Sequence, residues 1–115
     1  MKCDEEYSAL VKATEKLHDL YYQQETADTQ FSNALRAAEN HLIAAGLVRL
    51  VNATPAEIIY SLEESSEKNF SSLHEAAVAK SQVDVKAAAA EELFQYASQR
   101  YETCLKENAK DENSN

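Results

Sequence analysis

The stretch Asn52-Ala53-Thr54-Pro55-Ala56-Glu57 has the composition of a sharp turn that leads into a helix. Thr54 is a favourable N-cap, because its hydroxyl can accept a hydrogen bond from a backbone N–H in the first helical turn. Pro55 follows at the first helical position, where its missing N–H costs nothing and its fixed φ suits a helix. Glu57 lies three residues after Thr54 and completes a capping box. We therefore predict a turn over residues 52–54 and a helix that begins at residue 55.

N-terminal to this turn, apolar residues recur at alternating spacings of three and four, which is the pattern of an amphipathic helix. The first apolar column consists of Tyr7, Leu10, Leu17, Tyr21, Phe31, Leu35, Ala38, Leu42 and Ala45. A second column beside it consists of Ala13, Leu20, Ala27, Ala34 and Val48. Together they form an apolar face broader than a two-stranded coiled coil needs, which favours a helical bundle. The pattern predicts one helix over about 5–51.

The same spacing continues after the turn and predicts a second long helix over about 55–106. Serine and asparagine compete for backbone hydrogen bonds, so a kink is allowed near 64–72, and a matching polar stretch lies near 24–29. Residues 107–115 contain no apolar residue except alanine, and we expect them to form a disordered acidic and polar tail.

The expected fold is therefore all-α, with one helical domain over 1–106 that forms an antiparallel hairpin of two long helices. Such a hairpin places Leu17 opposite Ala87, and it brings Gln24 and Asp28 near Lys80. Because a lone hairpin would leave much of the broad apolar face exposed, we expect two copies to complete a four-helix bundle as a homodimer. If both weak stretches break, the alternative is a compact three- or four-helix bundle.

The chain is acidic, with 20 Asp and Glu residues against 11 Lys and Arg and a formal net charge of −9. This charge argues against direct binding to nucleic acid or to an anionic membrane surface. No apolar run approaches the roughly 20 residues that a helix needs to cross a bilayer. No apolar segment of a signal peptide follows Lys2, so we expect a cytoplasmic protein.

Cys3 and Cys104 are the two cysteines, and an unbroken antiparallel hairpin brings them near each other at its open end. A disulfide there would close a loop of about 100 residues, which is worth about 4–5 kcal/mol in the chain-entropy model. Without a secretion signal we favour two reduced thiols, and the disulfide is the alternative. A thiol redox sensor is a weaker alternative, because no basic residue or histidine is clearly placed beside either cysteine.

Two short motifs resemble metal-binding patterns but are incomplete. Glu15-Lys16-Leu17-His18 matches the E-x-x-H motif that carboxylate-bridged di-iron bundles use twice, and here it occurs once. Glu63-Glu64-Ser65-Ser66-Glu67 has a spacing that can bind magnesium, but no second acidic pair follows on the inner face. No nucleophile–base arrangement is visible, and a single glycine cannot build a phosphate-binding loop. We predict no metal site, no cofactor, no catalytic residue and no enzymatic activity.

Two sets of residues are candidates for contact with a partner. Apolar and tyrosine side chains beside the main seam form the first set, because tyrosine is enriched at interface hot spots: Leu20, Tyr22, Val48, Tyr60 and Tyr96. Glutamates of the second helix form a candidate acidic face: Glu63, Glu64, Glu67, Glu75, Glu91 and Glu92.

These features predict a small acidic interaction or adaptor protein, chaperone- or accessory-like in kind, that acts through helix–helix contacts. Its expected partner is protein: a second copy of the chain or a partner helix. The alternative is a nucleic-acid mimic, in which the acidic face inhibits a basic nucleic-acid-binding protein.

Overall fold

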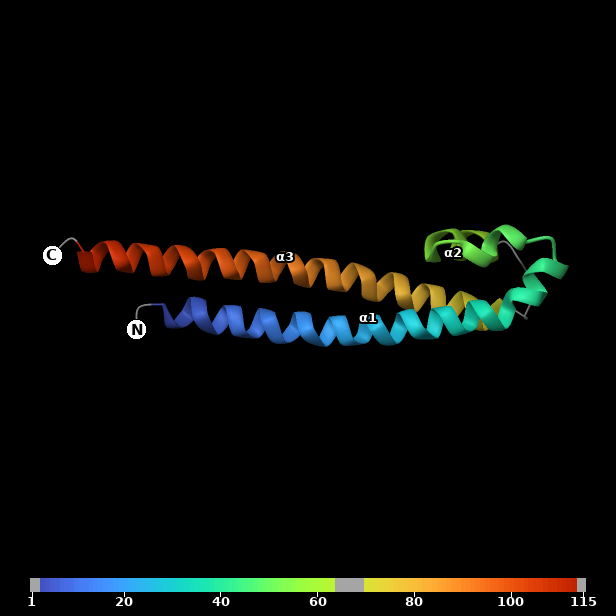
Figure 1. The fold of residues 1–115 in the computed structure, drawn as a ribbon, viewed down its shortest axis with the longest axis horizontal. Coiled ribbons are helices and arrows are strands. Elements are labelled where there is room, and N and C mark those ends of the chain that lie inside the picture. The colour runs from blue at the N-terminus through green and yellow to red at the C-terminus, as the bar shows by residue number, and fades with distance from the viewer. Residues whose placement is uncertain (1–2, 64–69, 114–115) are drawn as a thin grey trace. The chain divides into compact units, whose positions relative to one another are not determined.

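The computed structural model describes residues 3–63 and 70–113, with side chains over 3–62 and 70–109. Its elements are helix α1 (Asp4–Ala44), the 3-10 helix η1 (Val48–Asn52), helix α2 (Pro55–Glu63) and helix α3 (Ser71–Asn113) (Figure 1). Every regular element of the described residues is helical, so the predicted all-α class is confirmed.

The described residues fall into two compact units. The terminal unit comprises the chain up to Tyr21 together with the segment from Lys86 onward, and the turn unit comprises Tyr22–Val85. Within each unit, α1 and α3 run side by side in opposite directions (Figure 1). The predicted antiparallel helical hairpin is therefore present in both units.

The predicted turn chemistry is found at the start of α2. The backbone N–H of Glu57 donates to the Thr54 hydroxyl over 3.3 Å, and that hydroxyl donates to the Glu57 carboxylate over 3.0 Å. The backbone N–H of Ile58 donates to the Thr54 carbonyl over 3.1 Å. The bond from Glu57 satisfies a donor that a helix start otherwise leaves unpaired, the bond from Ile58 is the first regular bond of the helix, and α2 begins at Pro55 as predicted.

The first helix ends at Ala44, earlier than the predicted residue 51. Gly46 has a φ of +77°, the left-handed conformation that glycine adopts at no steric cost. The N–H of Leu47 donates to the Leu42 carbonyl over 2.8 Å, and the N–H of Gly46 donates to the Ile43 carbonyl over 3.1 Å. This pair of bonds is a Schellman motif, which terminates the helix before η1 begins.

The predicted second helix is divided into α2 and α3. The kink expected near 64–72 falls mainly on residues 64–69, which lie outside the described residues. The other weak stretch, 24–29, lies within the uninterrupted helix α1. Helix α3 extends to Asn113. The prediction of a disordered tail from residue 107 was therefore wrong for the described residues 107–113. One stabilising contact at this end is the ion pair of Lys106 with Glu102, at 3.1 Å and one helical turn apart.

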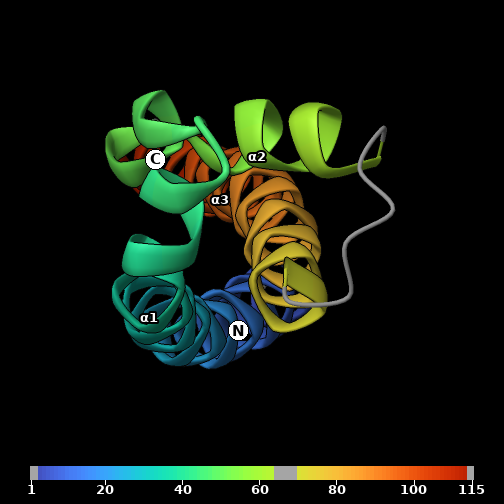
Figure 2. The ribbon, with the colours of Figure 1, turned by 90° about the vertical axis from the view of Figure 1, so that its right-hand side faces the viewer.

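The core of the turn unit is built from all of its helices. It contains Phe31, Ala38, Leu42, Leu50, Ile58, Leu62, Phe70, Leu73 and Ala77. Figure 2 shows α1, η1, α2 and the first turns of α3 arranged together in this unit. Helix α2 contributes Ile58 and Leu62 and so covers apolar side chains of the α1–α3 pair. Within this unit the chain forms a small helical bundle, close to our alternative prediction.

Polar contacts in the turn unit mark the pairing of α1 with α3. Lys80 pairs with Asp28, it lies 3.5 Å from Asp84, and Gln24 donates to Asp84 over 2.6 Å. The predicted neighbourhood of Gln24, Asp28 and Lys80 is thus present. The hydrogen bond to Asp28 is the main cause that raises the pKa of Lys80 above its usual value.

The terminal unit has a smaller core of Leu17, Leu20, Ala87 and Ala90, with Phe94 packed against it. Leu17 and Ala87 share this cluster, in agreement with the predicted pairing. Leu20, which we predicted as a partner contact, is only 6% exposed and packs within this cluster. At Leu20, the second apolar column therefore faces α3.

None of the helices in the described part of the chain has the length and apolarity needed to cross a bilayer.

Candidate functional site

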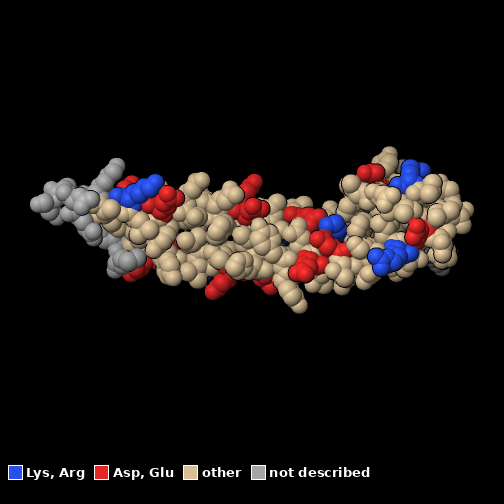
Figure 3. Space-filling model, viewed as in Figure 1, with Lys and Arg blue, Asp and Glu red and all other residues tan. Residues whose placement is uncertain are grey.

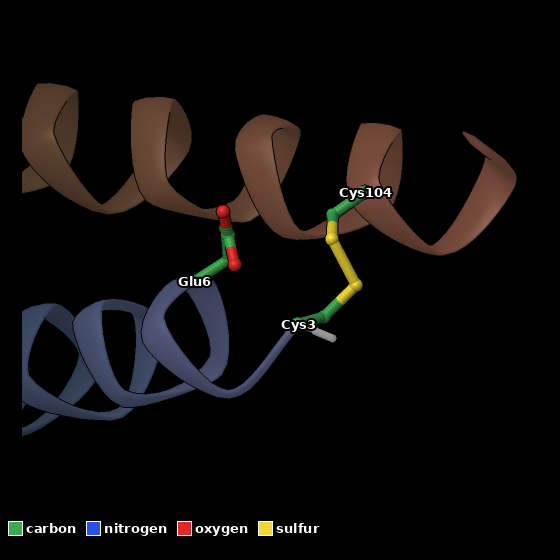
Figure 4. A group of neighbouring side chains, drawn as sticks. All are labelled: Cys3, Glu6 and Cys104. Carbon is green, nitrogen blue, oxygen red and sulfur yellow. A yellow bond between two sulfur atoms is a disulfide. The ribbon is translucent and has the colours of Figure 1, made fainter. Parts of the chain in front are cut away.

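A disulfide between Cys3 and Cys104 ties α1 to α3 in the terminal unit (Figure 4). The two residues are 101 positions apart in the sequence, and their Cα atoms lie 6.0 Å apart. The sequence led us to favour two reduced thiols, but the structure contains the disulfide that we gave as the alternative. Cys3 immediately precedes α1, and its carbonyl accepts the N–H of Tyr7 over 2.9 Å. One sulfur therefore lies at a helix N-terminus, where the macrodipole favours negative charge.

Asn108 places an amide group against the same two sulfurs. Its Nδ2 atom lies 2.9 Å from Cys3 Sγ and 3.7 Å from Cys104 Sγ. Because Asn108 follows Cys104 by one helical turn, the two side chains lie on the same face of α3. An amide N–H in this position would stabilise a thiolate more than a thiol.

Glu6 completes the cluster from the first turn of α1. Its side chain points toward α3 beside the disulfide (Figure 4). The Oε2 atom of Glu6 is buried and has no hydrogen-bond partner among the described residues. The ligand atoms of Cys3, Glu6 and Cys104 all lie within 4.8 Å of one another. Two sulfurs and a carboxylate oxygen at this spacing are a donor set suited to a divalent transition metal.

An aromatic contact lies one turn further along the pair. The rings of Tyr7 and Tyr101 have centroids 5.5 Å apart and planes tilted by 50°. Such tilted pairs add about 0.5–1.5 kcal/mol of stability beyond that which comes from burying the two rings. The contact holds α1 and α3 together next to the cysteines. It therefore limits how far the side chains of the cluster can move apart.

A cavity of about 130 Å³ opens beside Glu6. Its walls are Glu5, Glu6, Ala9, Tyr96, Ala97 and Arg100. The guanidinium of Arg100 lies 5.8 Å from the centre of the Tyr96 ring, within the range of a cation–π contact. The cavity is large enough for several water molecules, and Glu6 forms part of its wall.

The other predicted contact residues are dispersed over the two units. Tyr22, Val48 and Tyr60 are exposed in the turn unit, and Tyr96 is exposed in the terminal unit. Of the predicted acidic face, Glu75, Glu91 and Glu92 are exposed, whereas Glu64, Glu67 and the side chain of Glu63 lie outside what the structure describes. Figure 3 shows Asp and Glu side chains in small separate groups on the visible face. The described part of the chain therefore presents no continuous acidic face in this view.

Sequence reasoning missed Glu6 and Asn108 as neighbours of the cysteines. Their spacing in the sequence could have indicated this, because Glu6 follows Cys3 by three residues and Asn108 follows Cys104 by four. Residues at these spacings share one face of a helix. The polar composition of 107–115 predicts a disordered tail, which gives Asn108 no expected contact with the cysteines.

Comparisons with known proteins identify no relative of this chain: no family model, curated protein or solved structure matches it. A helical hairpin does not assign an activity either, since helical bundles host many unrelated functions. The side chains and surfaces of the two units are therefore the basis for a functional proposal.

Proposed function

We propose that the chain is a protein–protein interaction module whose terminal unit binds helices of a second copy of the same chain. The observation that carries this proposal is a difference between the two units. In the turn unit α2 covers part of the α1–α3 pair. The terminal unit contains segments of α1 and α3 alone, and none of its described residues plays the part of α2.

The proposed contact surface is one stripe of α3, formed by Ala89, Leu93, Tyr96 and Arg100. Their spacings of four, three and four place them on one side of the helix. Leu93 is 55% exposed and Tyr96 is 60% exposed. Ala89 is also exposed, and its small side chain allows another helix to approach closely. Apolar anchors at these intervals are the pattern by which helices recognise one another.

A second copy is the simplest partner because a two-fold dimer uses the same stripe on both sides of the interface. Two terminal units would contribute four helices, and a four-helix bundle buries apolar stripes of this width. The same packing would bury Leu93 and Tyr96 from each copy. The proposed activity is therefore assembly through helix–helix contacts, with no catalytic step.

The test compares two matched substitutions on α3 by sedimentation equilibrium. Leu93→Glu alters the proposed stripe, and Leu105→Glu alters an exposed leucine nine residues after Tyr96, about 180° around the helix. We expect Leu93→Glu to weaken dimerisation by at least about tenfold, the loss associated with roughly 1.4 kcal/mol at an interface. Leu105→Glu should leave dimerisation unchanged. Equal effects of the two substitutions would contradict the assignment of the stripe.

A further inference from the structure

We propose that the reduced form of this chain binds one Zn²⁺ ion through the Cys3 thiolate, the Glu6 carboxylate and the Cys104 thiolate. The three ligand atoms already lie within 4.8 Å of one another in the disulfide form. They come from two helices of one unit, so binding requires no contact beyond the terminal unit. All three ligands belong to one copy of the chain, although the cavity beside them shares Tyr96 and Arg100 with the proposed contact stripe.

The arrangement needs little movement to accept the ion. In a tetrahedral site with zinc–sulfur bonds of about 2.3 Å, two thiolates lie roughly 3.8 Å apart. The Cα atoms of Cys3 and Cys104 are 6.0 Å apart, so rotation of the two side chains can separate the sulfurs after reduction. Glu6 lies between α1 and α3 next to both sulfurs (Figure 4). The aromatic contact of Tyr7 with Tyr101 helps to hold the two helices in place.

The local charges favour a cation once the disulfide is reduced. Two thiolates and one carboxylate carry three negative charges, and further acidic side chains, Asp4 and Glu5, lie in the first turn of α1. A divalent cation would offset this concentration of negative charge and would give the buried Oε2 atom of Glu6 a partner.

Asn108 and the cavity beside Glu6 supply the remaining features of the site. The amide of Asn108 lies against both sulfurs, where it can donate to metal-bound thiolates. The cavity lined by Glu6, Tyr96 and Arg100 reaches one side of the cluster. Three protein ligands leave a fourth position, which water from this cavity can fill.

Binding and the disulfide exclude each other, so the site is controlled by reduction. A dithiol reductant transfers two electrons and two protons to the Cys3–Cys104 bond, and the dithiol is itself oxidised to a disulfide. The chain then carries two thiols. When Zn²⁺ binds, each thiol releases its proton to solvent and coordinates as a thiolate. A small-molecule disulfide reverses the sequence: it accepts two electrons from the cysteine pair and becomes two thiols, the Cys3–Cys104 bond forms again, and the ion is released.

The test uses the full chain, reduced with a water-soluble phosphine that takes oxygen from water and becomes a phosphine oxide. After removal of the phosphine under anaerobic conditions, Co²⁺ alone is titrated as a spectroscopic probe. We expect one ion per chain, with thiolate-to-cobalt charge-transfer absorption, and no such absorption from the oxidised chain. Zn²⁺ should raise the melting temperature of the reduced chain and leave that of the oxidised chain unchanged.

Matched variants identify the ligands. Glu6→Gln should weaken binding by at least about tenfold, because loss of even an outer-shell partner typically costs about 10–100-fold. Asn108→Ala should weaken it by about tenfold for the same reason. Glu5→Gln removes a neighbouring charge without removing a ligand, so it should weaken binding far less than Glu6→Gln, and circular dichroism checks that each variant is helical. Absence of the charge-transfer absorption in the reduced chain, or equal affinities of the Glu6 and Glu5 variants, would overturn the proposal.

Discussion

Cys3 and Cys104 are bonded to each other across 101 positions of sequence, which places this one covalent link between α1 and α3. A link that closes so long a loop mainly restricts the unfolded chain, and removing a native disulfide typically costs about 2–5 kcal/mol. We predict that reduction in the absence of metal lowers the free energy of unfolding by this amount, as measured by urea denaturation. The double variant Cys3→Ser/Cys104→Ser should unfold identically with and without reductant. An unchanged wild-type midpoint on reduction would contradict this contribution.

Gly46 ends α1 through its left-handed backbone rather than through close packing. Its φ is +77°, and a Cβ built on it meets nothing within 4 Å. Gly46→Ala should therefore cost about 1–2 kcal/mol, the penalty of this conformation for a residue with a side chain. Gly46→Asn should cost less, because asparagine tolerates the conformation better. Denaturant midpoints of the two variants provide the measurement, and equal losses would point to a steric cause instead.

The hydrogen-bonded pair Lys80–Asp28 predicts a pH dependence in the alkaline range. Hydrogen bonding to Asp28 raises the pKa of Lys80 from its usual 10.5 in the folded chain. The contribution of this pair to the free energy of unfolding is therefore fully present below about pH 10.5. It is lost as the pH rises through the higher pKa that Lys80 has in the folded chain. Because Asp28 is half exposed, the contribution should stay below about 1 kcal/mol. The alkaline loss of stability should be smaller in Lys80→Met than in the wild type, and identical losses would exclude the pair as its source.

The proposed dimer should resist salt. Its contact stripe is centred on Leu93 and Tyr96, and salt shortens the range of electrostatic attraction from about 10 Å at 0.1 M to about 3 Å at 1 M. Raising the salt concentration over this range should therefore leave the dimer intact in sedimentation experiments. Dissociation by salt would instead indicate charged contacts. Salt-sensitive capture of a basic protein would favour the acidic nucleic-acid mimic.

Local sequence signals predicted the start of α2 well and the end of α1 poorly. Thr54 and Glu57 form their capping contacts because both partners lie within one helical turn. Gly46 was visible as the single glycine, but its role as a helix terminator depended on bonds from residues 46 and 47 back to α1. Periodicity continued past it, and we followed the periodicity to residue 51.

Long-range placement was harder, since an apolar pattern does not say which column meets the partner helix. Leu20 lay in the second column and was assigned to a partner contact, but α3 packs over it. Folding two helices directly back on the turn also omitted the separate helix α2, which contributes Ile58 and Leu62 to the core. The cluster around Glu6 required both the helical phase of each cysteine and the pairing of the helices, and neither follows from composition.

The most direct test of the proposed self-association is light scattering in line with size exclusion, on the oxidised chain at tens of micromolar. We predict a mass of twice 12.8 kDa. The mass should be the same in the presence of reductant, because the proposed contact between the two copies contains no covalent bond. A mass of 12.8 kDa under both conditions would contradict assembly through a second copy. A larger mass that disappears with reductant would replace the helix–helix contact with an intermolecular disulfide.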